Sequence, residues 1–213
     1  MTRPLVITDC DEVLMHMVVP FAEWVDAEHG VILRIEDASF ANALKRKECG
    51  TPLEAAEVWP LLDGFFRAEM GRQYPVPGAL AAMAAIAEQA DIVVLTNVGP
   101  EHQQARVEQL AAHDFHAPVI GSRGGKGDPV RRLIEQYRPS VAIFIDDLAN
   151  HHSSVAREAP EVWRLHLVGE PAIADKIAPA RHAHARIDDW NVARDWILAR
   201  LTENSPAPTP ELA

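Results

Sequence analysis

The stretch Leu5-Val6-Ile7-Thr8-Asp9-Cys10-Asp11-Glu12-Val13-Leu14 decides the fold of this chain. It opens on apolar and β-branched residues, and such runs are typical of parallel strands that are buried on both faces. Asp9 and Asp11 follow at once, so we expect them at the carboxyl end of the strand, where open α/β sheets bind ligands. Two carboxylates this close repel each other unless a cation or hydrogen bonds compensate. The stretch therefore predicts a strand that ends in a metal site, although Asp-x-Asp alone is also typical of a solvated turn.

The later part of the chain alternates between helical and strand-like segments. Strands are expected at residues 91–95, 118–120, 141–145 and 162–167, and helices at 79–89, 101–112, 128–137, 153–158 and 189–201. Such alternation indicates a parallel sheet with helices on both faces. The fold class predicted is therefore α/β, a Rossmann-like parallel sheet sandwiched by helices.

Residues 18–74 have helical spacing and interrupt this alternation. A helix around Phe21 to Val25 would end at Gly30, and a second would run from Asp37 toward Lys47. A third would begin at the capping box Thr51-Pro52-Leu53-Glu54, with proline at its first position. We expect Pro60 to divide this helix, and the aromatic side chains of the segment to form its core (Trp24, Trp59, Phe65 and Phe66).

These segments predict a division of the chain into domains. A core domain would comprise residues 1–17 and 75–202, and residues 18–74 would form a small α-helical cap domain inserted into it. Residues 203–213 contain three prolines and are expected to be a disordered tail. The sequence does not distinguish a monomer from a homodimer.

The net charge, the cysteine count and the length of the apolar runs indicate which partners the protein can bind and in which cell compartment it is expected. The formal net charge of −11 over 213 residues argues against nucleic acid, which requires a basic surface. It leaves a small phosphorylated substrate open. Two cysteines are too few for a disulfide framework, and no apolar run approaches the roughly 20 residues of a membrane span. The first residues lead directly into a core strand, which leaves no room for a signal peptide. We therefore expect a cytoplasmic protein with no membrane partner.

Polar side chains follow the other predicted strands as well. Thr96 follows the strand at 91–95, and Asp146 and Asp147 follow the strand at 141–145. Lys126 lies in a glycine-rich loop at 121–127, just before a predicted helix. In a parallel sheet all of these groups reach one edge. Mg²⁺ prefers a few carboxylate oxygens together with water and substrate phosphate, and a lysine suits the phosphate oxygens. The sequence therefore predicts a site for Mg²⁺ and a phosphate group.

Four segments of the chain, in order, resemble the four motifs of the haloacid dehalogenase (HAD) superfamily of hydrolases. They are Asp9 to Leu14, Val93 to Asn97, Lys126 with Gly127-Asp128-Pro129, and Phe144 to Asp147. The resemblance covers nearly the whole chain, and the insert at 18–74 matches the superfamily's cap at its first insertion point. It implies a HAD-like fold and a Mg²⁺-dependent phosphatase that hydrolyses a small phosphorylated metabolite.

The resemblance also implies catalytic roles. Asp9 would be the nucleophile that forms an aspartyl-phosphate, and Asp11 would protonate the leaving oxygen and later activate water. Thr96, Asn97 and Lys126 would hold the phosphoryl oxygens, and Lys126 would also offset charge on the nucleophile.

The same resemblance implies a set of metal ligands. Asp9 and Asp146 would bind Mg²⁺ directly, and Asp11 would bind it through its backbone carbonyl. Asp147 or Asn150 would support the ion through water, and we favour Asp147.

Several alternatives stay open at this point. A phosphomutase of the same superfamily uses the same residues, and a non-catalytic binding or regulatory protein can retain the fold. Many members carry Gly-Thr where this chain has Glu12-Val13, so Glu12 and His16 are candidates for substrate selection. His151 and His152 are expected at the surface. Residues 18–74 are expected to close over the strand ends as a mobile lid.

Overall fold

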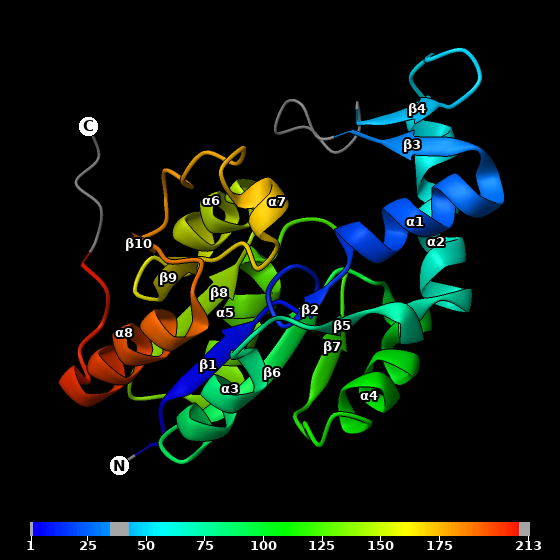
Figure 1. Cartoon of the computed structure of the whole chain (residues 1–213). Coiled ribbons are helices and arrows are strands. Elements are labelled where there is room, and N and C mark those ends of the chain that lie inside the picture. Colours follow the sequence, from blue (N-terminus) through cyan, green and yellow to red (C-terminus); the bar gives the residue numbers. More distant parts are fainter. Residues whose placement is uncertain (1, 35–42, 209–213) are drawn as a thin grey trace.

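The computed structural model describes residues 2–34 and 43–208 and has an α/β fold (Figure 1). Its central sheet contains six parallel strands in the order β10-β9-β8-β1-β6-β7. Their bounds are β1 (Leu5–Thr8), β6 (Asp91–Thr96), β7 (Val119–Gly121), β8 (Ala142–Asp146), β9 (Trp163–His166) and β10 (Ala185–Arg186). The predicted parallel sheet is confirmed, and β1 lies at its centre between β8 and β6.

Helices cover both faces of this sheet, and each face has its own apolar core. Successive side chains of a strand point to opposite faces. Val6 therefore packs on one side with α3 (Ala79–Ala87) and α8 (Trp190–Glu203), while Leu5 and Ile7 pack on the other. The second face is covered by α5 (Gly127–Tyr137) and α6 (Ala149–Glu158). Burial on both faces is why β1 is an uninterrupted apolar run.

The inserted segment, described at residues 18–34 and 43–72, projects from the carboxyl edge of the sheet (Figure 1). Its elements are α1 (Val18–His29), β3 (Val31–Leu33), β4 (Leu44–Arg46), α2 (Ala55–Ala68) and the 3-10 helix η2 (Met70–Arg72). They enclose a separate apolar cluster that includes Phe21, Trp24 and Phe65. The chain enters and leaves this segment through β2 (Met15–His16) and β5 (Tyr74–Pro75), which pair antiparallel.

Four predictions within this segment are wrong. A helix was expected to run from Asp37 toward Lys47, but Leu44–Arg46 is a strand that pairs antiparallel with β3. Residues 37–42 of that expected helix lie outside the described residues. The helix α2 begins at Ala55, because the capping box forms between Glu54 and Glu57. Pro60 lies inside α2 without dividing it. Val58 and Phe65, on either side of Pro60, are anchored in the same apolar cluster, which offsets the lost hydrogen bond. Trp59 is 68% exposed and does not join that core.

The remaining elements differ from expectation mainly at their ends. A short 3-10 helix η3 (Pro100–His102) precedes α4 (Gln103–Ala111), and α7 (Pro171–Ala174) follows β9. Part of the tail that was expected to be disordered contacts the core. Glu203 ends α8, Ser205 accepts a hydrogen bond from Trp163 and Ala207 donates one to Glu161. Residues 209–213 lie outside the described part. Among the described residues, no helix has the length and apolar character needed to cross a membrane.

Candidate active site

Three predicted site residues meet at the carboxyl edge of the sheet. Because β1 and β8 are neighbours with Thr8 opposite Ile145, the residues that follow, Asp9 and Asp146, are brought close together. Lys126 Nζ lies 2.8 Å from Asp9 Oδ2 and 2.7 Å from Asp146 Oδ2. The lysine side chain is fully buried. The three groups that the sequence placed at one edge therefore form a direct ion-paired cluster.

The position of Lys126 depends on close packing of α5 against α6. The amide of Gly127, the first residue of α5, donates a hydrogen bond of 2.9 Å to Ser154 Oγ on α6. A Cβ atom at Gly127 would lie 2.4 Å from the carbonyl oxygen of Ser154. Only glycine permits this approach, so the glycine after Lys126 lets α5 begin near β8.

Burial and charge perturb the titration of this cluster. Burial raises the pKa of Asp9 to about 6; Asp146 and Asp11 add to the rise, while Lys126 opposes it. Burial would also raise the pKa of Asp146, but Lys126 and a hydrogen bond from His151 hold it below its ordinary value. Burial alone would lower the pKa of Lys126, yet Asp146 and Asp9 raise it above its usual range. The lysine is therefore held as a cation between two carboxylates.

Asp147 adds a further carboxyl group that has no comparable compensation. It is buried, and burial together with the charges of Asp146 and Asp9 raises its pKa well above the ordinary value. When Asp9, Asp146 and Asp147 are ionised, Lys126 offsets only one of their three charges. Asn150, the alternative predicted support for a metal, is exposed on α6. The burial of Asp147 favours it over Asn150.

The carboxylate oxygens of this cluster fit a hard divalent cation. Ligand atoms of Asp9, Asp146 and His151 lie within 4.8 Å of one another. Carboxylate oxygens are the ligands that Mg²⁺ prefers, and the uncompensated negative charge calls for a cation. Asp9 and Asp146 would hold Mg²⁺, with Asp147 buried beside them.

The two histidines after Asp147 are not at the surface, so that prediction is wrong. His151 and His152 are both buried at the start of α6. His151 Nδ1 lies 2.9 Å from Asp146 Oδ1, and His152 Nε2 lies 3.0 Å from the Asp146 carbonyl oxygen. The helix begins four residues earlier than expected, which turns both rings toward β8. They orient the Asp146 side chain and its backbone.

Asp11 takes part in a second network that the sequence analysis missed. Arg106 Nη2 donates to both carboxylate oxygens of Asp11, at 2.7 and 2.9 Å, and Gln73 Nε2 donates to Oδ1 at 2.6 Å. The guanidinium of Arg106 is fully buried and also donates to Gln73 and to Gln109. The one sequence signal was the spacing of Arg106, Gln109 and Leu110, which lie on the buried face of α4.

Thr96 and Asn97 lie beside these groups. Thr96 is fully buried at the end of β6, and its hydroxyl is 3.5 Å from Asp11 Oδ2. The Asn97 amide donates to the Gly124 carbonyl at 3.0 Å and accepts from Ser122 Oγ at 2.9 Å. Asn97 therefore links β6 to the glycine-rich loop, and a phosphate-binding role for it stays a prediction.

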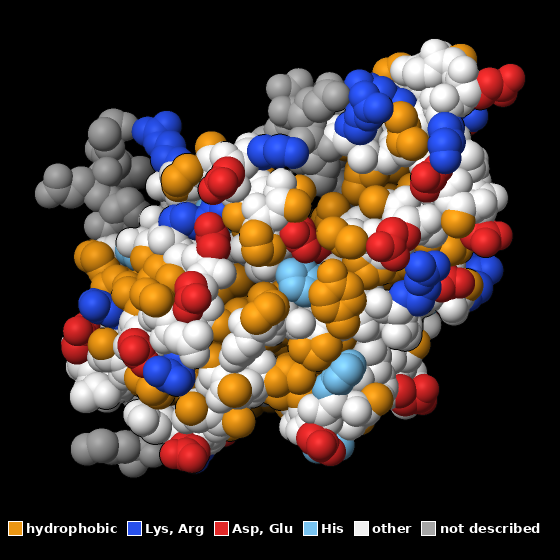
Figure 2. Space-filling model, viewed as in Figure 1, with side chains coloured by type: hydrophobic (Ala, Val, Ile, Leu, Met, Phe, Trp, Pro, Cys, Tyr) orange, Lys and Arg blue, Asp and Glu red, His pale blue; other side chains and the backbone are white. Residues whose placement is uncertain are grey.

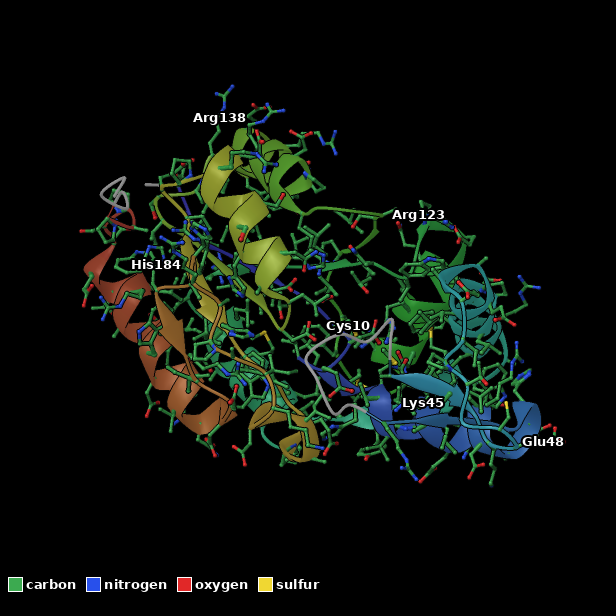
Figure 3. All side chains as sticks on the ribbon, turned by 90° about the horizontal axis from the view of Figure 1, so that it is seen from above. Cys10, Lys45, Glu48, Arg123, Arg138 and His184 are labelled. Atoms are coloured by element: carbon green, nitrogen blue, oxygen red, sulfur yellow. The ribbon has the colours of Figure 1, made fainter. Side chains whose placement is uncertain are left out.

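Figure 3 shows where this site lies in the molecule, and Figure 2 shows the charges on one face of it. Seen from above in Figure 3, Cys10 lies near the middle, between the sheet and the inserted segment that carries Lys45 and Glu48. The Cys10 side chain is buried, and burial raises the pKa of its thiol to about 12, so it is a packed residue. On the face drawn in Figure 2, Lys and Arg side chains are interspersed with acidic and apolar ones and form no continuous basic area.

Comparisons with known proteins locate the fold. No family model and no curated protein sequence matches the chain. Solved structures do match, and several of them are described as haloacid dehalogenase-like hydrolases. A protein from Lactobacillus delbrueckii, provisionally described as a phosphoglycolate phosphatase, superposes with a TM-score of 0.63 at 17% identity, covering 92% of this chain and 99% of that one.

Of two further matching structures, one is described as a magnesium-bound hydrolase and the other as a phosphomutase. A HAD hydrolase from Bacillus subtilis, described as bound to magnesium and as showing interdomain movement, gives a TM-score of 0.62 at 12% identity over 93% of this chain and 100% of that one. A protein from Thermotoga maritima, provisionally described as a β-phosphoglucomutase, gives 0.57 at 16% identity over 94% and 99%. The chain therefore has the HAD-like fold that its motifs implied.

Proposed function

We propose that this chain is a Mg²⁺-dependent phosphatase that hydrolyses a small phosphomonoester through an aspartyl-phosphate on Asp9. The observation that carries the proposal is the fully buried Lys126, whose ammonium bridges Asp9 and Asp146 at the carboxyl edge of the sheet. A buried carboxylate with a fixed cation beside it is suited to attack an anionic phosphoryl group. The HAD-like fold supports the same proposal, because one of the matching structures is provisionally described as a phosphoglycolate phosphatase.

The chemistry divides into two steps. In the first, a carboxylate oxygen of Asp9 bonds to phosphorus and the bond to the ester oxygen breaks, while Asp11 supplies the proton that makes the leaving group an alcohol. In the second, water gives a proton to Asp11 and its oxygen attacks the phosphorus, so that phosphate leaves and Asp9 is restored. Mg²⁺ bound by Asp9 and Asp146 would neutralise negative charge on the phosphoryl group.

The surrounding residues hold charge and orientation through both steps. Lys126 offsets the charge of Asp9 and of the phosphoryl oxygens. Thr96 and Asn97 stand at the end of the neighbouring strand, where they are suited to bind those oxygens. Arg106 and Gln73 are positioning residues, because Arg106 from α4 and Gln73 from the end of η2 hold the Asp11 carboxylate.

The inserted segment supports a small substrate. The described parts of the inserted segment, residues 18–34 and 43–72, project beside the strand ends (Figure 1), and we infer that the segment acts as a lid, with β2 and β5 as the hinge. The interdomain movement described for the Bacillus subtilis protein is consistent with this role. Such a lid would exclude proteins and duplex nucleic acid, leaving small phosphorylated metabolites.

A phosphomutase is the second candidate, because the match from Thermotoga maritima is described as one and the same side chains would serve. The two activities differ in the acceptor of the phosphoryl group, which is water in a phosphatase and a sugar hydroxyl in a mutase. Measuring phosphate release alongside isomerised phosphoester separates them.

The test is a panel of small phosphate esters with Mg²⁺, including an aryl phosphate. We expect phosphate release by the parent and none by Asp9→Asn. Asp195→Asn, which changes an exposed carboxylate on α8, is the matched control and should behave as the parent. Parent turnover no higher than that of Asp9→Asn across the panel would overturn the proposal. Beryllium fluoride, a phosphoryl mimic, should bind to the parent with Mg²⁺; failure to bind would favour the non-catalytic alternative.

A further inference from the structure

A second group of metal-ligating side chains lies outside the catalytic cluster, where the inserted segment joins the core. Glu12 lies in the loop after β1, His16 lies in β2, and Glu170 is the N-cap residue of α7. His16 Nδ1 lies 3.1 Å from Glu170 Oε2 and 3.9 Å from Glu12 Oε2. All three side chains are buried, so two carboxylates and an imidazole converge away from bulk water.

The free atoms of this group point at one another. Glu12 Oε1 accepts the amides of Met17 and Val18 at 2.7 and 2.5 Å, and Glu170 Oε1 accepts the amide of Ala172 at 2.9 Å. These bonds fix the carboxylates and leave their Oε2 atoms turned inward. Glu12 Oε2 is buried and has no hydrogen-bond partner among the described residues, and His16 Nδ1, although 3.1 Å from Glu170 Oε2, makes no hydrogen bond of good geometry with it. Such orphaned polar atoms are costly unless a ligand satisfies them.

The backbone of Glu12 supports a built site. Its φ angle is 56°, in the left-handed region that non-glycine residues rarely adopt. Strain of this kind persists where the surrounding structure holds it, and it is common at ligand sites. The same residue is anchored by its carbonyl, which accepts the amide of Gly169, the neighbour of Glu170. Glu12 and Glu170 are therefore held together by main chain as well as by side chain.

The charge of this group is also unbalanced. Across residues 2–34 and 43–208, the ion pairs of Glu12 and Glu170 involve His16 and no Lys or Arg. Burial raises the pKa of Glu12 to about 7, so either a proton or a cation would relieve the charge of two buried carboxylates that face one imidazole. Around an ion with bonds of about 2.0–2.2 Å, tetrahedral ligand atoms stand roughly 3.3–3.6 Å apart, and the two separations from His16 Nδ1 lie on either side of this range.

We propose that Glu12, His16 and Glu170 form a second metal site, which binds a first-row transition ion, with Zn²⁺ as the best fit. One nitrogen and two oxygen ligands suit Zn²⁺, whereas Mg²⁺ takes oxygen ligands only. Of the three ligands, Glu170 lines a hollow of about 460 Å³ together with Val18, Arg34 and Lys176, so a water molecule as fourth ligand would reach the ion from the Glu170 side. The ion joins the loop after β1, the entry strand β2 and the start of α7, and so fixes the base of the inserted segment.

The experiment uses the full chain in the Asp146→Asn background, which weakens the catalytic cation site. Zn²⁺ is added, weakly bound metal is removed by dialysis, and bound metal and melting temperature are measured. Co²⁺ serves as a spectroscopic probe of nitrogen ligation. We expect about one retained Zn²⁺ per chain and a raised melting temperature, with both lost in His16→Gln and in Glu170→Gln. His113→Gln, a change at a histidine outside the site, is the matched control and should retain the ion.

Two results would overturn the inference. In the first, the Asp146→Asn protein retains no Zn²⁺. In the second, His16→Gln and Glu170→Gln in that protein fold and retain as much Zn²⁺ as Asp146→Asn alone. Circular dichroism establishes that the variants fold, and if His16→Gln does not fold, Glu170→Gln decides. The outcome is independent of phosphatase activity, so the proposed function and this site can fail separately.

Discussion

Replacing Arg106 by methionine tests the network that holds Asp11. The change removes a fully buried guanidinium that donates hydrogen bonds to Asp11, Gln73 and Gln109. The side-chain oxygens that accept these hydrogen bonds lose this donor. Breaking a buried ion pair by removing one partner costs about 3–5 kcal/mol. Because the Asp11 side chain is 16% exposed, water can solvate part of it, and we expect a loss near the lower end, about 3 kcal/mol.

Urea unfolding followed by circular dichroism measures this loss. For a chain of this size, 3 kcal/mol corresponds to a fall in melting temperature of roughly 6–12 °C. Arg131→Met is the matched control, because Arg131 forms its two ion pairs at the surface of α5 and should change stability far less.

A double-mutant cycle with Asp11→Asn separates the pair from general packing. Removing Asp11 first takes away the main charge partner of Arg106, so the second change should cost less than it does in the parent. We expect a coupling free energy of about 2 kcal/mol. Strictly additive losses, or a loss for Arg106→Met no larger than that for Arg131→Met, would refute the reasoning.

Three further outcomes concern the catalytic cluster and the helix after it. Mg²⁺ should raise the melting temperature of the parent but much less that of Asp146→Asn, measured over a Mg²⁺ titration, and equal shifts would place the ion elsewhere. The pKa of Asp9 is raised from 3.8 to about 6, so without metal its contribution to stability is fully present below about pH 4 and is lost as the pH rises through 6. Chelator-treated parent should show this loss in unfolding experiments across pH, and Asp9→Asn should show a smaller one, because Glu12 and Asp147, whose pKa values are also raised, still contribute. Gly127→Ala should destabilise by about 1–3 kcal/mol because its Cβ would meet the Ser154 carbonyl, while Gly71→Ala, with open space around it, should be nearly neutral in the same assay.

The sheet and its strand-end residues could be predicted because both depend on local pattern. The apolar run before Asp9 and the run before Asp146 are each buried on both faces, so composition alone marks them as strands. Parallel pairing then places their polar ends at one edge, where Lys126 meets them. The regular alternation of helix and strand left few other topologies available.

The rest depended on contacts between distant segments. Arg106 reaches Asp11 across 95 residues and Gln73 across 33, and no spacing rule gives that register. The hairpin at Leu44–Arg46 is stabilised by its pairing with β3, which overrode the weak helical pattern. His151 was misplaced because a helix start predicted four residues too late turns a different face toward Asp146.

The pairing of β2 with β5 has a consequence for how this architecture can vary. Met15 lies opposite Pro75 and His16 opposite Tyr74, so the chain leaves the core and returns to it at adjacent positions. The core therefore constrains only the short distance between β2 and β5, and it does not constrain the length of the chain between them. Loops whose ends are close tolerate insertion and exchange, so a differently sized module could be grafted between Met17 and Gln73 without a change in the register of the sheet. The β2–β5 pair is thus a fixed attachment point for the inserted segment. Exchange of that segment can change selectivity for a ligand while the strands that precede Asp9 and carry Asp146 keep their positions.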